Sequence, residues 1–578
     1  MSRVGSGIAR RLAIVVAVLV VALLGLVGRL VDLQLINHQD YRQQAQAEHV
    51  SRVDIIPRRG AILDRNGYPL AASVDAYDVL VDKHIWGDEA RRPAEKLADV
   101  LNRPTDEILA DLDESISREV VVARGLDYQA SVTVEELGLS GVRLMRSSRR
   151  VYPEGNMAPA LLGFLGRENF GLAGLELDYN RVLGGAAGAL VYERDGRGDI
   201  NPLADQKRVP ADPGADIVLT IDRYMQYLVE RELDATIKSH KGSGGTIIIM
   251  DPRTGAILAM ASRPSFDVTH LDFSDEDKAD FYRNRAITDM YEPGSVFKTI
   301  TMAAALNEGA VSPGSTYVDE GVFRASGWTI TNWDLGAHGV QTATQILTKS
   351  LNTGAAWLSQ LLGPDKFYDY VQRFGFGQLT DVGLSGESPG QVRTTADDGW
   401  YEVDLATNSY GQGINVTPLQ LITAISAIAN DGRLMRPYVV QEIRSGDEIQ
   451  VTQPVMVRQA ITPETANTLT DMMEGVVDGI TAIYSIEVPG YRVAGKTGTA
   501  SISVPGGYKP DSYIASFAGF VPSDDPVLAI LVKVDEPKDV PWGSAVCAPV
   551  FARLASAILP YLKVPPDSPA LVQENPSE

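Results

Sequence analysis

The fold of the second half of the chain is decided by the segment TIIIM-DPRTG-AILAMA at residues 246–261. Its two apolar arms flank a turn that contains Asp251, Pro252 and Gly255, residue types that favour turns. The arms are apolar along their length and do not alternate with polar residues, a pattern typical of strands that are covered on both faces. The segment therefore predicts a buried β-hairpin in the core of a sheet.

Further strands of this sheet are predicted near the end of the chain. Residues 512–521 and 527–534 read as two strands joined by the turn at 522–526. Residues 549–562 have apolar positions at helical spacing and could cover one face of the sheet. The sheet thus draws strands from both ends of one α+β domain, with a helical segment from about 295 to 480 between them.

The N-terminal segment is hydrophobic enough to cross a membrane. Residues 12–28 form an uninterrupted apolar run of 17 residues, and further apolar residues extend it to Ile36. A helix of this length could span a hydrocarbon core about 30 Å thick. Arg3, Arg10 and Arg11 precede the run, and no clear small-x-small cleavage site follows it. The sequence therefore favours an uncleaved anchor with a cytoplasmic N-terminus over a cleaved signal peptide.

The region between the anchor and the hairpin mixes short strands and helices. Residues 38–50 are polar and Gln-rich and predict a helical stalk. The segment RRGAILDRNG at 58–67 predicts a strand that enters an Asn-Gly hairpin turn. Residues 77–205 carry no nucleophile beside a base, so a scaffold is expected, in which Arg149 and Arg150 are solvated or form ion pairs.

Composition excludes several classes of partner. The net charge of −22 provides no basic surface for a phosphate backbone, so nucleic acid is not expected as a partner. The single cysteine, Cys547, lies in an apolar run and is predicted to be a small buried residue. The six histidines show no zinc spacing, and we expect neither a metal nor a cofactor.

The first motif with chemical content is Ser295-Val296-Phe297-Lys298, which follows Pro293-Gly294 and precedes a helix-compatible run. At a helix N-terminus, the Ser295 hydroxyl would lie one turn from the Lys298 amine. Serine is a weak nucleophile unless an adjacent base takes its proton, and a desolvated lysine can do so. A Ser-x-x-Lys pattern alone is weak evidence, because about one is expected by chance in a chain of this size.

Two further short motifs follow in the same domain. Ser350-Leu351-Asn352 offers a hydroxyl that could relay a proton and an amide that could hold a peptide group. Lys496-Thr497-Gly498-Thr499 reads as a strand with a glycine where another backbone must approach closely. Its Lys496 could attract a carboxylate. Each motif alone fits an ordinary surface segment equally well.

Together the motifs are specific. Ser-x-x-Lys, Ser-x-Asn and Lys-Thr-Gly in this order are the signature of penicillin-binding proteins and serine β-lactamases. The chain resembles the class B, monofunctional penicillin-binding proteins over nearly its whole length. The resemblance rests on the motifs, the anchor, and the following patterns: residues 59–67, Gly174-x-Glu176, Tyr410-Gly411-Gln412-Gly413 and Thr417-Pro418-Leu419-Gln420.

The resemblance implies an α+β multidomain fold. It consists of a single transmembrane helix, an elongated mixed α/β pedestal of the dimerisation type, and a β-lactamase-like transpeptidase domain. In that domain an antiparallel sheet is covered by helices and accompanied by an all-helical subdomain. The expected boundaries are a cytoplasmic tail at 1–11, the anchor at 12–36, the pedestal at 37–209, a linker with strand and helix at 210–243, the transpeptidase domain at 244–563 and a disordered tail at 564–578.

The resemblance also implies roles for the motif residues. Ser295 would attack the penultimate D-Ala of a peptidoglycan stem peptide, with Lys298 as the base, although the identity of the base is disputed among these enzymes. Ser350 would relay a proton to the departing D-Ala. Asn352 would bind the acyl donor, and Lys496, Thr497, Gly498 and Thr499 would hold the terminal carboxylate. Backbone N–H groups of Ser295 and Thr499 would form the oxyanion hole.

The segment Tyr291-Glu292-Pro293-Gly294-Ser295 and the ending at 543–551 resemble the division-specific branch more than the elongation branch. The resemblance implies a cell-membrane protein with an extracytoplasmic catalytic domain. Its substrates would be nascent or lipid-linked stem peptides, and β-lactams would trap the serine. Implied partners are a membrane glycan polymerase of the SEDS family and divisome proteins.

Several alternatives remain at this stage. An elongation-type transpeptidase, a D,D-carboxypeptidase, a β-lactamase and a non-catalytic β-lactam-binding sensor share the acylation motifs. Gly386-Glu387-Ser388-Pro389-Gly390 matches a hydrolase elbow, but the proline after Ser388 lacks the required N–H, so a loop serine is predicted. Trp328 and Trp333 could line the donor groove, but core packing is the preferred interpretation.

Overall fold

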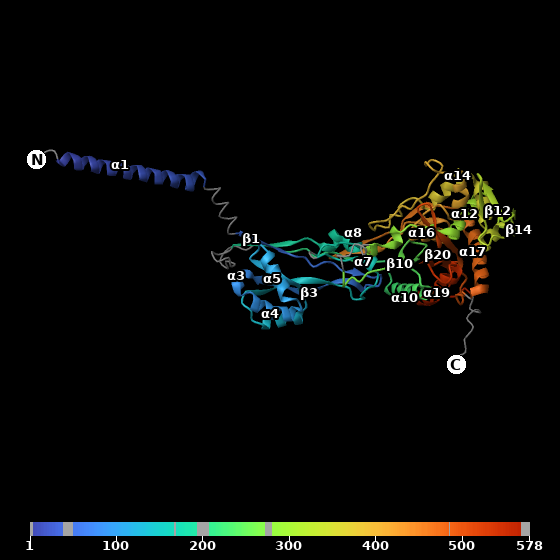
Figure 1. The fold of residues 1–578 in the computed structure, drawn as a ribbon, viewed down its shortest axis with the longest axis horizontal. Coiled ribbons are helices and arrows are strands. Elements are labelled where there is room, and N and C mark those ends of the chain that lie inside the picture. The colour runs from blue at the N-terminus through green and yellow to red at the C-terminus, as the bar shows by residue number, and fades with distance from the viewer. Residues whose placement is uncertain are drawn as a thin grey trace. The chain divides into compact units, whose positions relative to one another are not determined.

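The computed structural model describes residues 4–37, 50–166, 169–193, 207–271, 280–484 and 486–567 (Figure 1). The chain forms two compact units, residues 1–58 with 185–213, and residues 59–184 with 214–578. The predicted stalk at 38–50 lies outside the described residues except for Val50, and the predicted tail does so from residue 568 onward.

The first unit contains the predicted membrane helix. Helix α1 (Val4–Val31) continues into the π-helical η1 (Asp32–Ile36). The 27 residues of Arg10–Ile36 contain an 18-residue window with a mean hydropathy of 2.8, and their apolar side chains are exposed. At 1.5 Å per residue they extend about 40 Å, enough to cross a membrane. The same unit holds a three-stranded antiparallel sheet of β1 (Val50–Ile55), β6 (Gly188–Glu193) and β7 (Lys207–Val209).

The second unit contains the predicted hairpin and its sheet. Strands β9 (Gly244–Met250) and β10 (Ile257–Arg263) pair in antiparallel register, with Met260 opposite Ile248. The full sheet has the order β10-β9-β21-β20-β19, and every neighbouring pair is antiparallel. The predicted strands near the chain end are confirmed. They are β20 (Gly507–Val521) and β21 (Leu528–Asp535). The strand predicted at Lys496–Thr499 is also confirmed and is part of β19 (Ala494–Val504).

Both faces of this sheet are covered, as the unbroken apolar pattern predicts. Successive side chains of a strand point to opposite faces. Ile247 and Ile249 pack in one core with α10 (Arg223–His240) and α19 (Ala548–Tyr561). Ile248 and Met250 pack on the other face with α16 (Pro418–Ala429). Gly543–Tyr561 is also long and apolar enough to span a membrane, but it is mostly buried here and serves as a core helix.

The segment from 295 to 480 is mainly helical but also contains short β-ribbons. The ribbons pair β11 (Thr316–Asp319) with β14 (Gly339–Thr342), β12 (Val322–Ala325) with β13 (Trp328–Thr331), and β15 (Arg433–Met435) with β18 (Met456–Gln459). The subdomain expected to be all-helical is thus a helical body with β insertions. Its helices are α12 (Lys298–Asn307), α13 (Ala343–Thr348), α14 (Asn352–Arg373), α15 (Glu402–Asn408) and α17 (Pro463–Tyr484).

A second sheet runs through the pedestal and continues into the catalytic half. The predicted Asn-Gly turn connects β2 (Ile62–Leu63) to the long β3 (Pro69–Asp82), with Gly67 at a φ of +86°. The sheet has the order β17-β16-β8-β2-β3-β4, and β5 also pairs with β3. Its other strands are β4 (Glu119–Leu126), β5 (Val142–Val151), β8 (Asp216–Leu219), β16 (Val440–Ser445) and β17 (Glu448–Val451).

Helices of the pedestal pack on this sheet around a small apolar core. The core includes Val79 and Val81 from β3, Trp86, and Leu97 from α4. The pedestal helices are α3 (Lys83–Trp86), α4 (Arg91–Leu101), α5 (Thr105–Glu114), α6 (Tyr128–Glu136), α7 (Pro159–Leu162), α8 (Gly174–Asp178) and α9 (Asn180–Gly184).

A buried ion cluster connects distant segments of the pedestal. The Glu176 carboxylate accepts hydrogen bonds from Arg59 Nε and Arg150 Nε, each at 2.6 Å. Arg59 also donates to the Glu176 carbonyl at 2.7 Å, and Arg150 donates to the Gly60 carbonyl at 2.7 Å. The ion-pair alternative for Arg150 is therefore confirmed. One carboxylate is thus the shared counter-ion of two guanidinium groups that have almost no access to water.

We expect Glu176→Ala to lower the free energy of unfolding by about 3–5 kcal/mol, because it leaves two buried cations without their counter-ion. Chemical denaturation of the purified protein measures this loss. Glu119→Ala is the matched control, since Glu119 pairs with Arg143 on the exposed surface, where an ion pair contributes at most about 1 kcal/mol. Equal losses for the two variants would contradict the assignment.

Candidate active site

Ser295 lies in a tight turn between a helix and the edge strand of the catalytic sheet. The 3-10 turn η4 (Gly294–Phe297) leads directly into α12. Gly294 has a φ of +55°, and a Cβ on it would lie 2.9 Å from the Thr499 carbonyl oxygen of β19. Its N–H donates to the Gly411 carbonyl at 3.1 Å. A glycine is therefore required for this turn to approach β19, and Ser295 lies at the start of a helix, as predicted.

Lys298 is buried beside Ser295, with an exposed fraction of 1%. Its Nζ lies 3.0 Å from Ser295 Oγ, 2.8 Å from Asn352 Oδ1, and 2.6 and 3.2 Å from the Ser350 carbonyl oxygen and Oγ. Burial, and secondarily the charge of Lys496, hold the pKa of Lys298 well below the usual lysine range. A neutral amine next to the serine hydroxyl can accept its proton.

Ser350 lies between the two lysines of the site. Its Oγ is 3.2 Å from Lys298 Nζ and 3.0 Å from Lys496 Nζ. The residue occupies the junction of α13 and α14 with a φ of +56°. A non-glycine residue in this left-handed region costs roughly 1–2 kcal/mol, so the surrounding structure must hold it in place.

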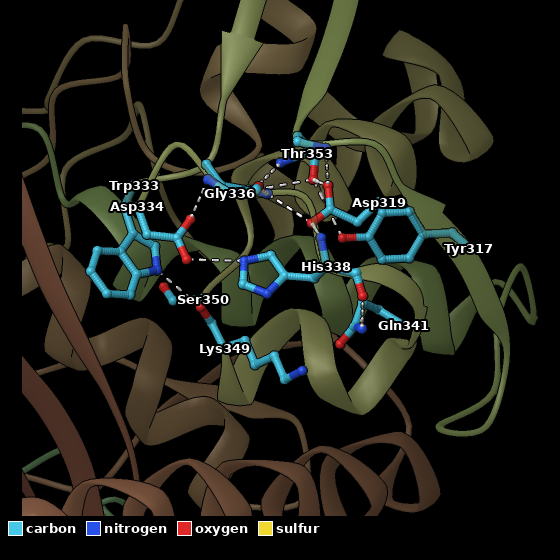
Figure 2. A network of polar contacts seen from close by, with 12 residues as sticks. Tyr317, Asp319, Trp333, Asp334, Gly336, His338, Gln341, Lys349, Ser350 and Thr353 are labelled. Carbon is cyan, nitrogen blue, oxygen red and sulfur yellow. Dashed lines mark hydrogen bonds and ion pairs between the residues drawn. The ribbon is translucent and has the colours of Figure 1, made fainter.

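A buried polar network holds the loop that precedes Ser350. Asp319 Oδ1 accepts from Thr353 Oγ1 at 2.8 Å, and its Oδ2 accepts from Asn332 Nδ2 at 2.8 Å and from the His338 N–H at 3.1 Å. Asn332 also accepts from the Thr353 N–H at 3.3 Å. Figure 2 shows Asp319 and Thr353 together beside the loop that carries Trp333, Gly336 and His338. The network fixes the first turn of α14 relative to this loop.

Asn352 connects the lysine to the same loop. Its Oδ1 accepts from Lys298 Nζ, and its Nδ2 donates to the Thr331 carbonyl at 2.9 Å. The Asn352 amide of the second motif is thus next to the Lys298 amine, and both of its polar atoms already have hydrogen-bond partners. This arrangement orients the Lys298 amine toward Ser295.

Lys496 enters the site from β19 and is buried like Lys298, with an exposed fraction of 1%. Its Nζ contacts Ser350 Oγ at 3.0 Å and Thr497 Oγ1 at 3.4 Å. Burial lowers the pKa of Lys496 to about 7. The amine therefore gains and loses its proton near neutral pH.

The strand around Lys496 packs closely against the serine turn. A Cβ on Gly498 would lie 2.9 Å from the Pro293 carbonyl and 2.4 Å from Ser516 Oγ. The sequence prediction of a close approach at this glycine is confirmed. Thr499 Oγ1 accepts from the Gly543 N–H at 3.3 Å. The three motifs, far apart along the chain, thus meet at one place.

The comparison with known proteins agrees with this geometry. Residues 245–556 match the family described as penicillin binding protein transpeptidase domain, and residues 54–219 match the family described as penicillin-binding protein dimerisation domain. The chain belongs to the penicillin-binding protein transpeptidase family. The expected class B membership, the α+β multidomain fold and the class of serine-type D,D-transpeptidase are confirmed.

Individual relatives match this penicillin-binding protein over most of its length. Stage V sporulation protein D of Bacillus subtilis is 36% identical over 518 residues, covering 88% of this chain and 79% of the relative. Peptidoglycan D,D-transpeptidase FtsI of Escherichia coli is 30% identical over 575 residues, covering 96% of this chain and 93% of the relative. The crystal structure of a peptidoglycan synthetase from Bifidobacterium adolescentis matches with a TM-score of 0.72 at 27% identity. The match covers 90% of this chain and 98% of the solved chain.

The two tryptophans singled out in the sequence are not core residues. Trp328 and Trp333 are 66% and 57% exposed, so the preferred core-packing interpretation is wrong for both. Short β-ribbons carry this region and leave one face open to solvent, which the sequence pattern did not reveal. Trp333 donates its indole N–H to the Lys349 carbonyl at 3.1 Å and meets Trp542 edge to face, with ring centroids 5.6 Å apart. Figure 2 shows Trp333 beside Lys349 and Ser350.

The sequence predictions for Ser388 and Cys547 are confirmed. Ser388 lies in a loop, where its hydroxyl accepts from the Gly390 N–H at 3.2 Å. Cys547 is fully buried, and burial raises the pKa of its thiol. Neither residue takes part in the site of this penicillin-binding protein.

Sequence reasoning missed the residues that support the motifs. Asp319 and Asn332 carry no local pattern, because their partners lie 13 to 34 positions away. Glu292 lies three residues before Ser295, but no local pattern shows which residues it contacts. Trp542 directly precedes the ending at 543–551, and no local pattern shows its contact with Trp333. The one available signal was an acidic residue so close to Ser295.

Asp319→Ala should lower the free energy of unfolding by about 3 kcal/mol, because several buried donors lose their acceptor. The same variant should slow acylation of the protein by a fluorescent penicillin, since the loop before Ser350 loses its support. Denaturation curves and labelling time courses measure the two effects. Asp365→Ala, on the exposed surface of α14, is the control and should change neither.

Proposed function

We propose that this chain is a membrane-anchored peptidoglycan D,D-transpeptidase that cross-links stem peptides through an acyl-enzyme on Ser295. The observation that carries the proposal is the position of Lys298 Nζ, 3.0 Å from Ser295 Oγ and joined through Ser350 Oγ to Lys496. This arrangement provides a nucleophile, a base and a proton relay in contact with one another.

In the acylation step, Ser295 Oγ attacks the carbonyl carbon of the penultimate D-Ala. The neutral Lys298 amine takes the hydroxyl proton as the C–O bond forms. The oxygen of the tetrahedral intermediate carries the negative charge. We assign its stabilisation to the backbone N–H groups of Ser295 and Thr499, and a single such donor can contribute about 3–4 kcal/mol. The close packing of η4 against β19 supports this assignment.

Breakdown of the intermediate requires a proton on the departing D-Ala nitrogen. Ser350 Oγ lies within hydrogen-bond distance of both lysine amines, so it can pass the proton from Lys298 to the leaving group. Protonated Lys496, with the Thr497 and Thr499 hydroxyls beside Gly498, would bind the terminal carboxylate of the donor. Asn352 would orient the donor peptide as well as Lys298.

The ester is then attacked by an amine from a neighbouring stem peptide, which restores the Ser295 hydroxyl and forms the cross-link. A β-lactam would undergo only the acylation step. Its ring amide opens on Ser295, and the fragment that would depart stays tethered in the site. Covalent trapping by penicillins is therefore the direct probe of the proposed nucleophile.

We place the protein in septal wall synthesis, with the N-terminus in the cytoplasm and the catalytic domain outside. The segment at 291–295 and the similarity to FtsI support the septal role. We propose a SEDS-family glycan polymerase and divisome proteins as partners of the anchor and pedestal. The proposed boundaries are tail 1–11, anchor 12–36, pedestal 37–209, linker 210–243, catalytic domain 244–563 and tail 564–578.

Ser295→Ala should abolish covalent labelling by a fluorescent penicillin and leave the thermal unfolding midpoint unchanged. The wild-type protein should convert lipid-linked or nascent glycan strands to cross-linked dimers, and the variant should not. Ser388→Ala is the control serine and should behave as wild type. Labelling of the alanine variant at the wild-type rate would disprove the assignment, and release of D-Ala without dimers would indicate a carboxypeptidase.

The acylation rate should depend on pH in a bell shape. Lowered lysine pKa values mean that the neutral amine forms at lower pH than usual, so Lys298 becomes an effective base as pH rises. Above about 7, Lys496 loses the charge that attracts the carboxylate, so the rate falls again. Lys496→Arg keeps its charge at high pH, so the decline in rate on the alkaline side should begin at a higher pH. Penicillin labelling rates between pH 5 and 10 test this expectation.

A further inference from the structure

The strand that carries Lys496 continues beyond the sheet as a two-stranded ribbon. Ala500 of β19 pairs with Ile514 of β20, which pairs with Asp535 at the end of β21. Within the part of the chain that the structure describes, no third strand pairs with residues 501–513, here called the ribbon. Most of the ribbon is exposed to solvent. An isolated two-stranded ribbon is only marginally stable in water, so its position depends on contacts with the rest of the domain.

One such contact reaches the segment that holds the nucleophile. Tyr508 lies opposite Ser503 near the tip of the ribbon. Its hydroxyl donates to the Glu292 carboxylate, 3.3 Å from Oε1 and 3.2 Å from Oε2. Glu292 is buried and precedes Ser295 by three residues. The hydroxyl thus joins the ribbon to the backbone turn of the catalytic serine.

Glu292 is also held from the other side. Its Oε1 accepts from the Gly413 N–H at 3.0 Å. Gly413 belongs to the turn in which the Gly411 carbonyl accepts from the Gly294 N–H. The single carboxylate therefore joins three segments that converge on Ser295. These segments are the turn at 291–295, the turn at 410–413 and the ribbon.

A second anchor of the ribbon does not reach the site. Lys509 forms an ion pair with Glu536, which follows β21, and the lysine side chain is half exposed. Exposed ion pairs contribute little to stability. The Tyr508 contact is a hydrogen bond to a buried charged group, a stronger class of interaction.

We propose that Glu292 and Tyr508 are positioning residues for acylation, because their contact holds the ribbon and the adjoining segment Thr497 to Thr499 against the Ser295 turn. This inference rests on the proposed roles of Ser295 and β19. Neither side chain touches the reacting atoms. Loss of the contact lets the base of the ribbon move away from η4, so the Thr499 N–H and the Ser295 hydroxyl no longer align in the transition state.

The test is the kinetics of penicillin acylation in the full chain, for wild type, Tyr508→Phe, Glu292→Gln and Glu292→Ala. Tyr508→Phe should lower the maximal acylation rate roughly tenfold, because one hydrogen bond to a charged group is lost. The half-saturating penicillin concentration should stay within about twofold, because the donor contacts are kept. Glu292→Gln retains a hydrogen-bond acceptor, so its maximal acylation rate should fall less than that of Glu292→Ala.

Hydrogen exchange provides a readout that does not depend on activity. Amides of residues 501–513 should exchange faster in Tyr508→Phe than in wild type, while the thermal midpoint and exchange in α12 stay unchanged. Tyr513→Phe is the matched control on the same strand and should leave rate and exchange unchanged.

Three outcomes would overturn the proposal. The first is a Tyr508→Phe variant that acylates like wild type. The second is an equal fall in acylation rate for Tyr508→Phe and Tyr513→Phe. The third is a slower acylation of Glu292→Ala while the acylation rate of Tyr508→Phe is unchanged. The last outcome would confine Glu292 to its contact with Gly413. A wild-type protein that does not label at all would instead disprove the proposed function, so the two failures are distinguishable.

Discussion

One serine hydroxyl bonded to two buried lysine amines is the constraint on which the catalytic domain depends. Lys298 and Lys496 both contact Ser350 Oγ, and both are almost fully buried. Burial of a charged amine costs several kcal/mol, and two like charges so close repel each other. The site therefore favours a state in which one amine is neutral. That state is also the one that can deprotonate Ser295.

Such a site exists only if the surrounding structure holds it, because the isolated groups would separate and hydrate. The sheet contributes Lys496 on its edge strand. The turn η4 contributes Ser295, and the first residue of helix α12 is Lys298, one turn further on. The Asp319 network holds Thr353, three residues after Ser350, whose backbone conformation serine disfavours. Each support belongs to a different part of the chain, so the site depends on the packing of the apolar cores on both faces of the sheet.

The sequence predicted the parts of this architecture that have a local cause. The hairpin at 246–261 followed from apolar residues on both faces, and the helix after Ser295 followed from its position and pattern. The convergence of the three motifs followed from a family resemblance, since no spacing rule joins residues 146 positions apart. The exposure of Trp328 and Trp333 could not be predicted, because an aromatic pattern does not reveal whether a small ribbon has a covered face. The Asp319 and Glu292 contacts likewise depend on long-range packing.

The continuous second sheet has a consequence for the integrity of the molecule. Strand β16 of the catalytic half pairs with β8, and β8 lies parallel to β2 of the pedestal. Segments near residues 62, 217 and 442 are therefore neighbours in one hydrogen-bonded layer. A protease that cut the connection at 210–214 would leave two fragments still joined by non-covalent strand pairing. Separately produced fragments divided at that point should accordingly reassemble through their complementary strand edges.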